Sequence, residues 1–411
     1  MEGGKIIGEG SKSCIFRPNI PCHNESDKVI DEGKISKIMY GEKSKGKSEY
    51  ELMISNKIKK IRGHKNWAII FEKQCEPPIY DDIMKYEPDI EKCIYGSSET
   101  ISSNSLDNNY MLVGNYGGIT LEDYFYSLFH KKITGKKLET NFLDLMNKMK
   151  PLFTGVKALL KNNIIHNDIK YNNILLDKEN FKLIDFGLSG TLDNKAHFKK
   201  RSKREFNTNR LYIFYPLEYI LFYANKKQLN DELIYIQNGQ ERHFTDDLKL
   251  ISHIFGYDYY GTWETIIERI NNKLINEEEM IKSIDVYSLG IIIPILFIHN
   301  NVNSPFPYEK SEMIAEFYQI FGLMIYPYSG KWREKSEGKN MLAPSFDAIC
   351  RKFNALLKKY NNKDSKSQRK SNKKTEKTKK TEKTEKTEKT KKTEKEKKKS
   401  VKRVRRVKRR V

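Results

Sequence analysis

Two short polar segments in the middle of the chain carry side chains suited to phosphoryl transfer. The first reads His-x-Asp-x-Lys-x-x-Asn and the second reads Asp-Phe-Gly. Asp168 could orient an attacking hydroxyl and accept its proton, and Lys170, two residues further along an extended loop, could reach the transferred phosphate. Asn173 and Asp185 offer the hard oxygen ligands that Mg²⁺ prefers. We therefore interpret the two segments as halves of one site for metal-assisted transfer to a hydroxyl group.

A β-hairpin is predicted between the two segments. Apolar runs at residues 174–176 and 181–184 flank a polar stretch at residues 177–180. This pattern is typical of two short strands joined by a tight turn. Such a hairpin would deliver Asn173 and Asp185 to the same place.

The two segments resemble the catalytic loop and the metal loop of eukaryotic-type serine/threonine protein kinases. The resemblance covers residues 4–360 and implies that Asp168 and Lys170 are catalytic, that Asn173 and Asp185 bind Mg²⁺, and that ATP is the phosphate donor. Lys170 resembles the serine/threonine-specific class, so the expected substrate is a protein with Ser or Thr acceptors. The opening of the chain and its divergent small lobe are also similar to protein kinases of large DNA viruses.

A glycine-rich loop near the start of the chain is similar to the family's G-x-G-x-x-G-x-V pattern, with Ser13 in place of the third Gly and Ile15 in place of Val. Small residues there let backbone N–H groups approach phosphate oxygens. The resemblance implies that the nucleotide is bound by Ile7, Gly8, Glu9, Gly10, Ser11, Lys12, Ser13, Cys14 and Ile15.

The family also has a strand lysine that holds the α- and β-phosphates and pairs with a helix glutamate. Lys37 is the preferred candidate because Ile35 and Ile38 flank it in a strand-like pattern, and Lys34 is the alternative. For the partner we favour Glu51, whose spacing to later isoleucines suits the packed face of a helix, with Glu49 as the alternative.

The element pattern predicts an α+β, bilobal fold like that of protein kinases. A small β-rich N-lobe is expected at residues 1–116, with an insertion at 75–109, and a larger helical C-lobe at 117–360. Strands are predicted at residues 5–7, 14–16, 34–40, 67–71 and 110–113, and helices at 49–61, 121–130 and 142–160. The hinge is expected near residues 114–118, with Gly114 at the gatekeeper position.

Two further motifs resemble the family's C-lobe. Tyr-Pro-Leu-Glu, ending at Glu218, is similar to the end of the activation segment, and Asp-Val-Tyr-Ser-Leu-Gly, beginning at Asp285, is similar to the helix beneath the catalytic loop. The resemblance implies that Asp285 hydrogen-bonds the catalytic-loop backbone. The two acids lie 67 positions apart, farther than is usual in the family, so residues 226–280 are expected to be an insertion.

The activation segment departs from the family pattern. Asn167 stands where the family usually has an arginine that pairs with a phosphate on this segment. Ser202 and Thr208 are the obvious phosphorylatable positions, and the segment carries its own cations at residues 199–204. We therefore expect activity without phosphorylation here. The basic run would either favour acidic acceptor sites or lie solvated.

The charge of the 411-residue chain, +22 in all, is concentrated at its C-terminal end. Residues 361–411 hold 25 of the 76 basic and 7 of the 54 acidic residues, which leaves the rest of the chain nearly balanced. Lys-Thr-Glu repeats and an almost complete lack of apolar residues before Val401 predict a disordered tail. The tail could bind nucleic acid or an acidic protein, act as a nuclear import signal, or only keep the protein soluble.

The remaining composition indicates an intracellular protein. Five scattered cysteines without a C-x-x-C pair argue against a disulfide framework or a zinc site and favour a reducing compartment, the cytoplasm or nucleus, or a host cell or virion if the protein is viral. No signal peptide is visible, and the apolar run at residues 291–298 is too short to span a bilayer and predicts a buried helix. We expect a monomer without a membrane partner.

Two alternatives remain at this point. Residues 41–48 fit the P-loop pattern G-x-x-x-x-G-K-[S/T] between a predicted strand and a predicted helix, which would indicate a P-loop ATPase. No alternating β-α-β pattern follows, which argues against it. The other alternative is a catalytically weak pseudokinase that serves as a scaffold, against which the presence of Lys37, Asp168, Asn173 and Asp185 argues.

Overall fold

The structure is a computed structural model of the chain, and it divides into two units, residues 1–354 and 355–411. The residues that it describes are 4–10, 13–23, 30–40, 43–84, 87, 109–208, 212–238, 246–256, 259–300, 306–325 and 345–363. Ser11 and Lys12 of the predicted phosphate loop, most of the 75–109 segment and nearly all of the basic tail lie outside them.

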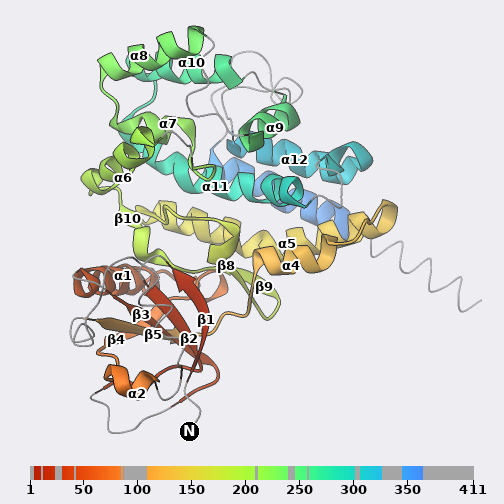
Figure 1. Ribbon diagram of the computed structural model, residues 1–411. Coiled ribbons are helices and arrows are strands. Elements are labelled where there is room, and N and C mark those ends of the chain that lie inside the picture. The colour runs from red at the N-terminus through yellow and green to blue at the C-terminus, as the bar shows by residue number, and fades with distance from the viewer. Residues whose placement is uncertain are drawn as a thin grey trace, which may run out of the picture. The chain divides into compact units, whose positions relative to one another are not determined.

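An antiparallel sheet forms the N-terminal part of the first unit (Figure 1). Its strand order is β1-β2-β3-β5-β4. The strands are β1 (Lys5–Gly10), β2 (Ser13–Arg17), β3 (Lys34–Met39), β4 (Phe71–Cys75) and β5 (Tyr110–Asn115). The predicted opening hairpin, third strand and hinge strand are therefore confirmed.

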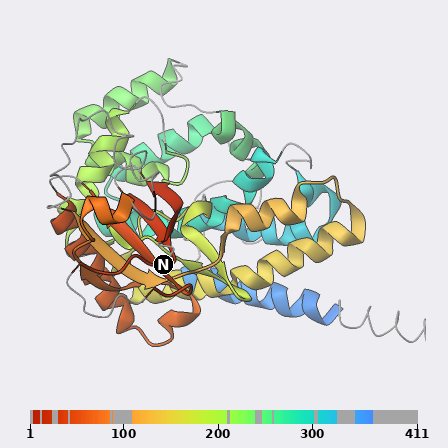
Figure 2. The ribbon, with the colours of Figure 1, turned by 60° about the horizontal axis from the view of Figure 1, so that its bottom comes forward.

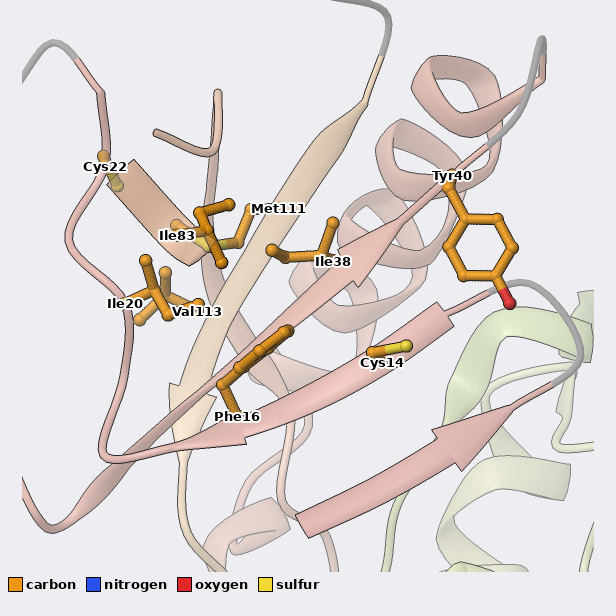
Figure 3. Close-up of a cluster of buried hydrophobic side chains, with 9 residues drawn as sticks. All are labelled: Cys14, Phe16, Ile20, Cys22, Ile38, Tyr40, Ile83, Met111 and Val113. Atoms are coloured by element: carbon orange, nitrogen blue, oxygen red, sulfur yellow. The ribbon is translucent and has the colours of Figure 1, made fainter. Parts of the chain in front are cut away.

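The two faces of this sheet carry different side chains because neighbouring residues of a strand point to opposite sides. One face holds a buried apolar cluster that includes Phe16, Ile38, Met111 and Val113, and Ile83 of the short helix α2 (Tyr80–Met84) packs into it (Figure 3). On β3 the alternate residue, Lys37, therefore points to the opposite face. The apolar cluster thus packs one side of the sheet, and Lys37 lies on the other side.

Helix α1 (Ser44–Lys59) carries the partner of that lysine. Its buried residues recur at helical spacing and comprise Ser44, Ser48, Glu51, Ile54, Ser55 and Ile58. The helix begins five residues before the predicted start. Residues 44–48 of the P-loop pattern therefore lie within its first turns, and the sheet beside it is antiparallel. A P-loop needs an open loop after a parallel strand, so the P-loop interpretation is wrong.

Two cysteines of this region are joined by a disulfide. Cys22 and Cys75 have a Cα–Cα separation of 5.8 Å, which lies within the range that a disulfide needs. The expectation that the cysteines would remain unpaired is therefore wrong for this pair. Sequence separation hid it, because 53 positions lie between the two residues and only the folded sheet brings them together. The prediction of a reducing compartment therefore loses the support that it drew from the pattern of the cysteines, and it stays a prediction.

The rest of the unit is mainly helical (Figure 1). Its helices are α4 (Leu121–Phe129), α5 (Gly135–Lys161), α6 (Lys195–Asn207), α7 (Leu217–Ile220), α8 (Lys226–Gln237), α9 (Asp246–Phe255), α10 (Tyr259–Asn271), α11 (Glu277–His299) and α12 (Glu312–Ile325). Its short strands are β6 (Ile119–Thr120), β7 (Ile164–Ile165), β8 (Ile174–Asp177), β9 (Asn180–Leu183) and β10 (Gly190–Thr191). A β-sheet lobe followed by a helical lobe confirms the expected α+β, bilobal kinase-like fold.

Helices α5 and α11 build the core of the helical lobe. The side of α5 that faces inward includes Phe142, Leu145, Met149 and Leu152, all fully buried. Helix α11 is apolar and long enough to cross a membrane by length and composition alone, yet 78% of its most apolar window is buried inside the protein. A core helix gives the same signal, and the predicted buried helix at residues 291–298 lies within α11.

Besides α1, three further predicted segments differ from the structure. The strand expected at residues 67–71 is wrong, because β4 begins only at Phe71 and Trp67 follows a short 3-10 helix (His64–Asn66). Trp67 is instead a buried core residue at 1% exposure. Helix α5 begins seven residues before its predicted start, and the 226–280 segment consists largely of α8, α9 and α10.

The contact between Trp67 and Gly155 of α5 gives a test of the fold. A Cβ on Gly155 would lie 2.8–3.1 Å from three atoms of Trp67, whereas a Cβ on Gly46 of α1 would meet nothing within 4 Å. Gly46→Ala should gain up to about 1 kcal/mol of stability from helix propensity. Gly155→Ala should lose about 1–2 kcal/mol, because overpacking a rigid ring outweighs that gain. Urea unfolding of both variants measures the difference, and equal stability of the two would contradict this packing.

Candidate active site

The β8–β9 hairpin brings the two halves of the predicted site together. Ile174 pairs with Leu183, and the backbone N–H of Ile184 donates to the carbonyl of Asn173 at 3.0 Å. Asn173 therefore lies beside the residue that precedes Asp185. The register of the hairpin thus confirms that these two side chains are delivered to one place.

The catalytic loop is held from below by a buried carboxylate. Asp285 of α11 accepts hydrogen bonds from the backbone N–H groups of His166 (2.7 Å) and Asn167 (2.9 Å). Burial raises the pKa of Asp285, although His166 and these N–H groups act in the opposite direction. The hydrogen bonds from the catalytic-loop backbone to Asp285, which the resemblance implied, are therefore present in the structure.

Both oxygens of the Asp168 carboxylate have partners. Asn173 donates through Nδ2 to Oδ2 at 2.7 Å, and Lys170 Nζ lies 3.2 Å from the same oxygen. The Tyr212 hydroxyl donates to Oδ1 at 3.4 Å. Burial, together with the charge of Asp168, raises the pKa of Tyr212, so the phenol stays protonated as a donor. Asp168 is thus oriented from three sides and presents Oδ1 toward the activation segment.

A second cluster joins the sheet, α1 and the start of the activation segment. Lys37 Nζ lies 3.0 Å from Glu51 Oε2 and 2.9 Å from Asp185 Oδ1. Glu51 is completely buried, whereas the side chain of Asp185 keeps 42% of its exposure. The alternatives are excluded by position, because Lys34 pairs with the exposed Glu72 and Glu49 is exposed.

One buried cation between two carboxylates sets the charge states of this cluster. Burial alone would lower the pKa of Lys37, but the attraction of Glu51 and Asp185 outweighs it and the pKa is raised. Burial raises the pKa of Glu51 to about 7 against the opposing pull of Lys37. For Asp185 the Lys37 charge outweighs burial and lowers the pKa to about 2. Asp185 is therefore firmly anionic, and Glu51 is the member that can take up a proton.

The donor set suits a magnesium ion. Asp185 supplies an anionic carboxylate, and Asn173, whose Nδ2 is used by Asp168, keeps its amide oxygen as a hard ligand. Among the described residues, no group of three or more His, Cys, Asp or Glu side chains could hold a metal by itself. A magnesium ion here would complete its coordination with phosphate and water oxygens, as Mg²⁺ commonly does.

The described part of the glycine-rich loop forms the β1–β2 hairpin, with Gly10 opposite Ser13. Tyr40, at the end of β3, donates its hydroxyl to the carbonyl of Gly10 at 3.3 Å, and Figure 3 shows its ring extending toward this hairpin. Gly8, Glu9, Cys14 and Ile15 lie in the same hairpin, which Ile7 enters half exposed. The hairpin is thus tied to β3 close to Lys37.

Gly114 leaves room on the Lys37 side of the sheet, and the Phe71 ring lies close to it. Gly114 pairs with Ile35 and Leu112 pairs with Lys37, so Gly114 and Lys37 share one face of the sheet. A Cβ on Gly114 would lie 3.0 Å from the Phe71 ring, and Lys37 Nζ lies 5.6 Å from the centre of that ring. Phe71 therefore occupies the space behind the hinge.

The activation segment is tied to α1 and the catalytic loop without a phosphate. The carbonyl of Leu188 accepts from Asn167 Nδ2 at 3.1 Å and contacts His197 Nε2 at 3.0 Å. The next carbonyl, of Ser189, accepts from the Tyr50 hydroxyl at 2.9 Å, and the Tyr50 and His197 rings stack. Tyr50 directly precedes Glu51, so these contacts fix α1 relative to Asp185.

Ser202 is not the accessible acceptor that the sequence indicated. Its side chain is fully buried, and its hydroxyl donates to the carbonyl of Ile220 at 3.1 Å and accepts from the N–H of Tyr223 at 2.9 Å. Thr208 is exposed. Phosphorylation of Ser202 would therefore require local unfolding of α6, and Thr208 is the remaining candidate of the two.

Sequence reasoning missed four side chains of the site: Tyr40, Tyr50, Phe71 and Tyr212. None belongs to a contiguous motif, and each reaches its partner across 30 to 139 positions in the cases where a hydrogen bond is formed. Tyrosine and phenylalanine are common throughout this chain. No pattern of residue types therefore distinguished these four.

The amino-acid sequence is similar to those of known protein kinases. Residues 97–213 match the protein kinase domain family. The chain is 28% identical over 135 residues to the serine/threonine-protein kinase ppk31 of Schizosaccharomyces pombe, which covers 31% of this chain and 13% of the relative. It is 31% identical over 70 residues to the CTD kinase subunit alpha of Saccharomyces cerevisiae, which covers 17% and 13%.

A third relative extends the comparison to another lineage. The chain is 32% identical over 94 residues to calcium-dependent protein kinase 4 of Plasmodium falciparum, which covers 22% of this chain and 16% of the relative. The matches thus span between 13% and 16% of the length of these three relatives.

The raised pKa of Glu51 gives a pH test of the ion pair. Ionised Glu51 shares the Lys37 ammonium with Asp185, whereas protonated Glu51 leaves it to Asp185 alone, so kcat/KM for ATP should fall about tenfold from pH 8 to pH 6. Stability should change in the opposite direction. Because the pKa of Glu51 is raised on folding, its contribution to stability is present at low pH and is lost as the pH rises through about 7.

Glu51→Gln is the matched control, since it keeps an amide oxygen for Lys37 but cannot ionise. It should be slower at pH 8 and lose this part of the pH dependence in steady-state kinetics. If kcat/KM of the variant still falls at acidic pH, the remaining fall is caused by protonation of the nucleotide or of another group in the protein. An unchanged pH profile would show that Glu51 does not control Lys37.

Proposed function

Because the chain belongs to the eukaryotic-type protein kinase family, we propose that it is an active serine/threonine protein kinase. It would transfer the γ-phosphate of ATP to hydroxyl groups of other proteins. The observation that carries the proposal is the convergence of two clusters, Asp168 with Lys170 and Asn173, and Lys37 with Glu51 and Asp185. A phosphoryl-transfer site needs both, one for the acceptor and one for the donor.

Each side chain has a role that follows from its position. Asp168 accepts the proton of the acceptor hydroxyl at Oδ1, as the hydroxyl oxygen forms a bond to the γ-phosphorus and the bond to the departing ADP oxygen breaks. Lys170 places a positive charge beside the transferred group. Lys37 holds the α- and β-phosphates, and Glu51 keeps its ammonium in place.

Asn173 and Asp185 would hold Mg²⁺, and the glycine-rich hairpin would cover the nucleotide phosphates. The metal, when bound, neutralises phosphate charge and orients the γ-phosphate for in-line attack. The catalytic loop can then stay rigid during the reaction, because Asp285 already satisfies its backbone N–H groups. Preorganisation of this kind lowers the barrier without a reorganisation cost.

Lys170 is the residue that favours serine or threonine as the acceptor. Its ammonium lies 3.2 Å from Asp168. At this position it can contact the phosphate that is being transferred to the short side chain of a serine or threonine. The relatives whose printed names specify serine/threonine kinases support the same class. The rival function is a pseudokinase scaffold, and the intact ion-pair cluster argues against it.

The basic tail belongs to the proposal as a tether. Its net positive charge would bind nucleic acid or an acidic protein and so keep the kinase near its substrates, in the cytoplasm or the nucleus. We propose that the kinase domain itself acts as a monomer, since both clusters are complete within one chain.

The roles predict a hierarchy of variants. Asp168→Asn should reduce peptide phosphorylation by more than about a thousandfold and leave ATP affinity within about threefold, because Asp168 touches the acceptor and not the nucleotide. Lys37→Met should reduce the rate by about a hundredfold or more. Lys34→Met, at a half-buried position on β3, and Lys47→Ala, at an exposed position on α1, are the controls, and both should stay near wild type.

The measurements are transfer of labelled phosphate to a serine peptide and, separately, binding of ATP by calorimetry. If wild type binds Mg²⁺-ATP but transfers nothing, the pseudokinase alternative is correct. If activity is retained in Lys37→Met and lost in Lys47→Ala, residues 41–48 bind the nucleotide phosphates and the P-loop interpretation is correct after all.

The phosphate-free ties of the activation segment predict constitutive activity. Protein treated with a phosphatase, and Thr208→Ala, should both retain activity within about threefold of the untreated wild type, as monitored by intact mass and peptide phosphorylation. The reason is that Asn167, His197 and Tyr50 already hold the 188–189 backbone. A near-complete loss on dephosphorylation, restored by prior phosphorylation, would refute the prediction.

A further inference from the structure

Helix α6 presents a basic surface whose direction is fixed by the packing of its other side. Phe198, Ser202 and Phe206 are spaced four residues apart and buried. This spacing places one stripe of the helix against the protein. The side chains that are left exposed along it are Lys195, Lys199, Lys200, Lys203 and Arg204. The single acid of the helix, Glu205, is buried. It pairs with Arg201 and also attracts Arg204, so it offsets only part of the charge of this exposed side.

The cations near the start of α6 already have partners. Lys195 Nζ lies 3.1 Å and Lys199 Nζ lies 3.9 Å from the carboxylate of Glu277. Lys199 also lies over the Phe222 ring at 5.6 Å. These two residues therefore serve the packing between α6 and the start of α11.

The cations further along α6 have no acidic partner of their own on the surface. Lys203 lies over the Tyr223 ring at 5.0 Å, and none of Lys200, Lys203 and Arg204 forms an ion pair with the residues that the structure describes. Lys200 and Arg204 are one helical turn apart, and like charges at this spacing repel by a few tenths of a kcal/mol. We refer to Lys200, Lys203 and Arg204 as the α6 basic face.

The α6 basic face is connected to the acceptor end of the active site through helix α6 itself. Between its members lies Arg201, which turns inward to Glu205 at 3.1 Å and to the Tyr215 ring at 5.5 Å. The Tyr215 hydroxyl donates to the carbonyl of Asn167 at 2.9 Å, directly before Asp168. After α6 the chain reaches Tyr212, which contacts Asp168 itself.

The neighbouring elements support this placement. Figure 1 shows α6 beside α7, with β10 between α6 and the sheet, and both α7 and β10 contact α6. A protein segment whose hydroxyl reaches Asp168 would thus place its neighbouring residues within reach of the α6 basic face.

We propose that the α6 basic face selects the substrates of the proposed kinase, by binding carboxylate side chains that flank the acceptor Ser or Thr. This inference rests on the proposed function and names its substrate class. Charge complementarity carries it, because three exposed cations that form no ion pair among the described residues raise the local concentration of anionic partners beside the helix that contacts the acceptor site. The chain's own tail is not the occupant, since it is strongly basic and would be repelled.

The test compares three peptides that share one acceptor serine and differ only in the flanks, which are Asp/Glu, Asn/Gln or Lys. For the full-length wild type, kcat/KM should be about tenfold or more higher for the acidic than for the neutral peptide at low ionic strength. The ratio should shrink toward one in about 0.5 M salt, where exposed charges are screened.

Lys200→Glu combined with Arg204→Glu should bring the acidic-to-neutral ratio to one or invert it. Lys226→Glu with Lys227→Glu, a matched reversal of two exposed lysines on α8, should keep the wild-type ratio. The ratio is read within each protein, so a partial loss of folded enzyme does not change it. The salt dependence of the wild-type ratio provides a second measurement that needs no variant.

The outcomes separate this inference from the proposed function. Transfer to all three peptides with no preference for acidic flanks would overturn the inference and leave the kinase function standing. A preference that persists in the Lys200/Arg204 reversal would assign it to the tail and would also overturn the inference. Stronger competition by an oligonucleotide than by poly-Glu would make nucleic acid the occupant. No transfer to any acceptor would refute the kinase function and this inference together.

Discussion

The ammonium of Lys37 between the carboxylates of Glu51 and Asp185 is the interaction on which the rest of the structure depends. Its three members come from β3, α1 and the end of the β8–β9 hairpin. An unpaired charge in this environment would cost several kcal/mol, so the sheet, the helix and the hairpin must all be in place for the cluster to exist. The cluster thus couples the two lobes through electrostatics.

The same cluster carries one negative charge in excess when all three groups are ionised. That excess explains why the pKa of Glu51 is raised while the pKa of Asp185 is lowered: the fully buried acid takes the proton more readily than the exposed one. The exposed acid is also the one that a cation from solvent can reach. The distribution of burial over two chemically similar acids therefore leaves Glu51 as the buried partner of Lys37 and Asp185 as the acid that a cation from solvent could reach.

Around this cluster the catalytic loop is fixed mostly through its backbone. Asp285 and Tyr215 hold the main chain at Asn167 from two sides, and the side chain of Asn167 reaches the next segment at Leu188. Asn167 has a φ of 61°, in the left-handed region that asparagine adopts more readily than most residues. An uncharged residue at this position thus ties the activation segment directly, where a charged one would need a phosphate partner.

The sequence by itself determined the parts of this protein whose chemistry lies in contiguous stretches. Asp168, Lys170, Asn173 and Asp185 could be located because the loop that carries them is short and its spacing is fixed, and the hairpin between them follows from local patterning. The family resemblance called for a strand lysine and a helix glutamate, and local pattern then favoured Lys37 and Glu51 over their neighbours, since a strand and a helix each repeat their buried side.

Only the tertiary structure decided the features that join distant positions. The Cys22–Cys75 pair, the contacts of Tyr50 and Tyr212, and the position of Phe71 behind Gly114 all depend on how the strands and helices pack. Ser202 was a candidate phosphorylation site in the sequence, but in the structure its buried hydroxyl is hydrogen-bonded to the backbone of Ile220 and Tyr223. The physical reason is the same in each case: local propensity and spacing act over a few residues, whereas these contacts are selected by the burial and charge balance of the whole fold.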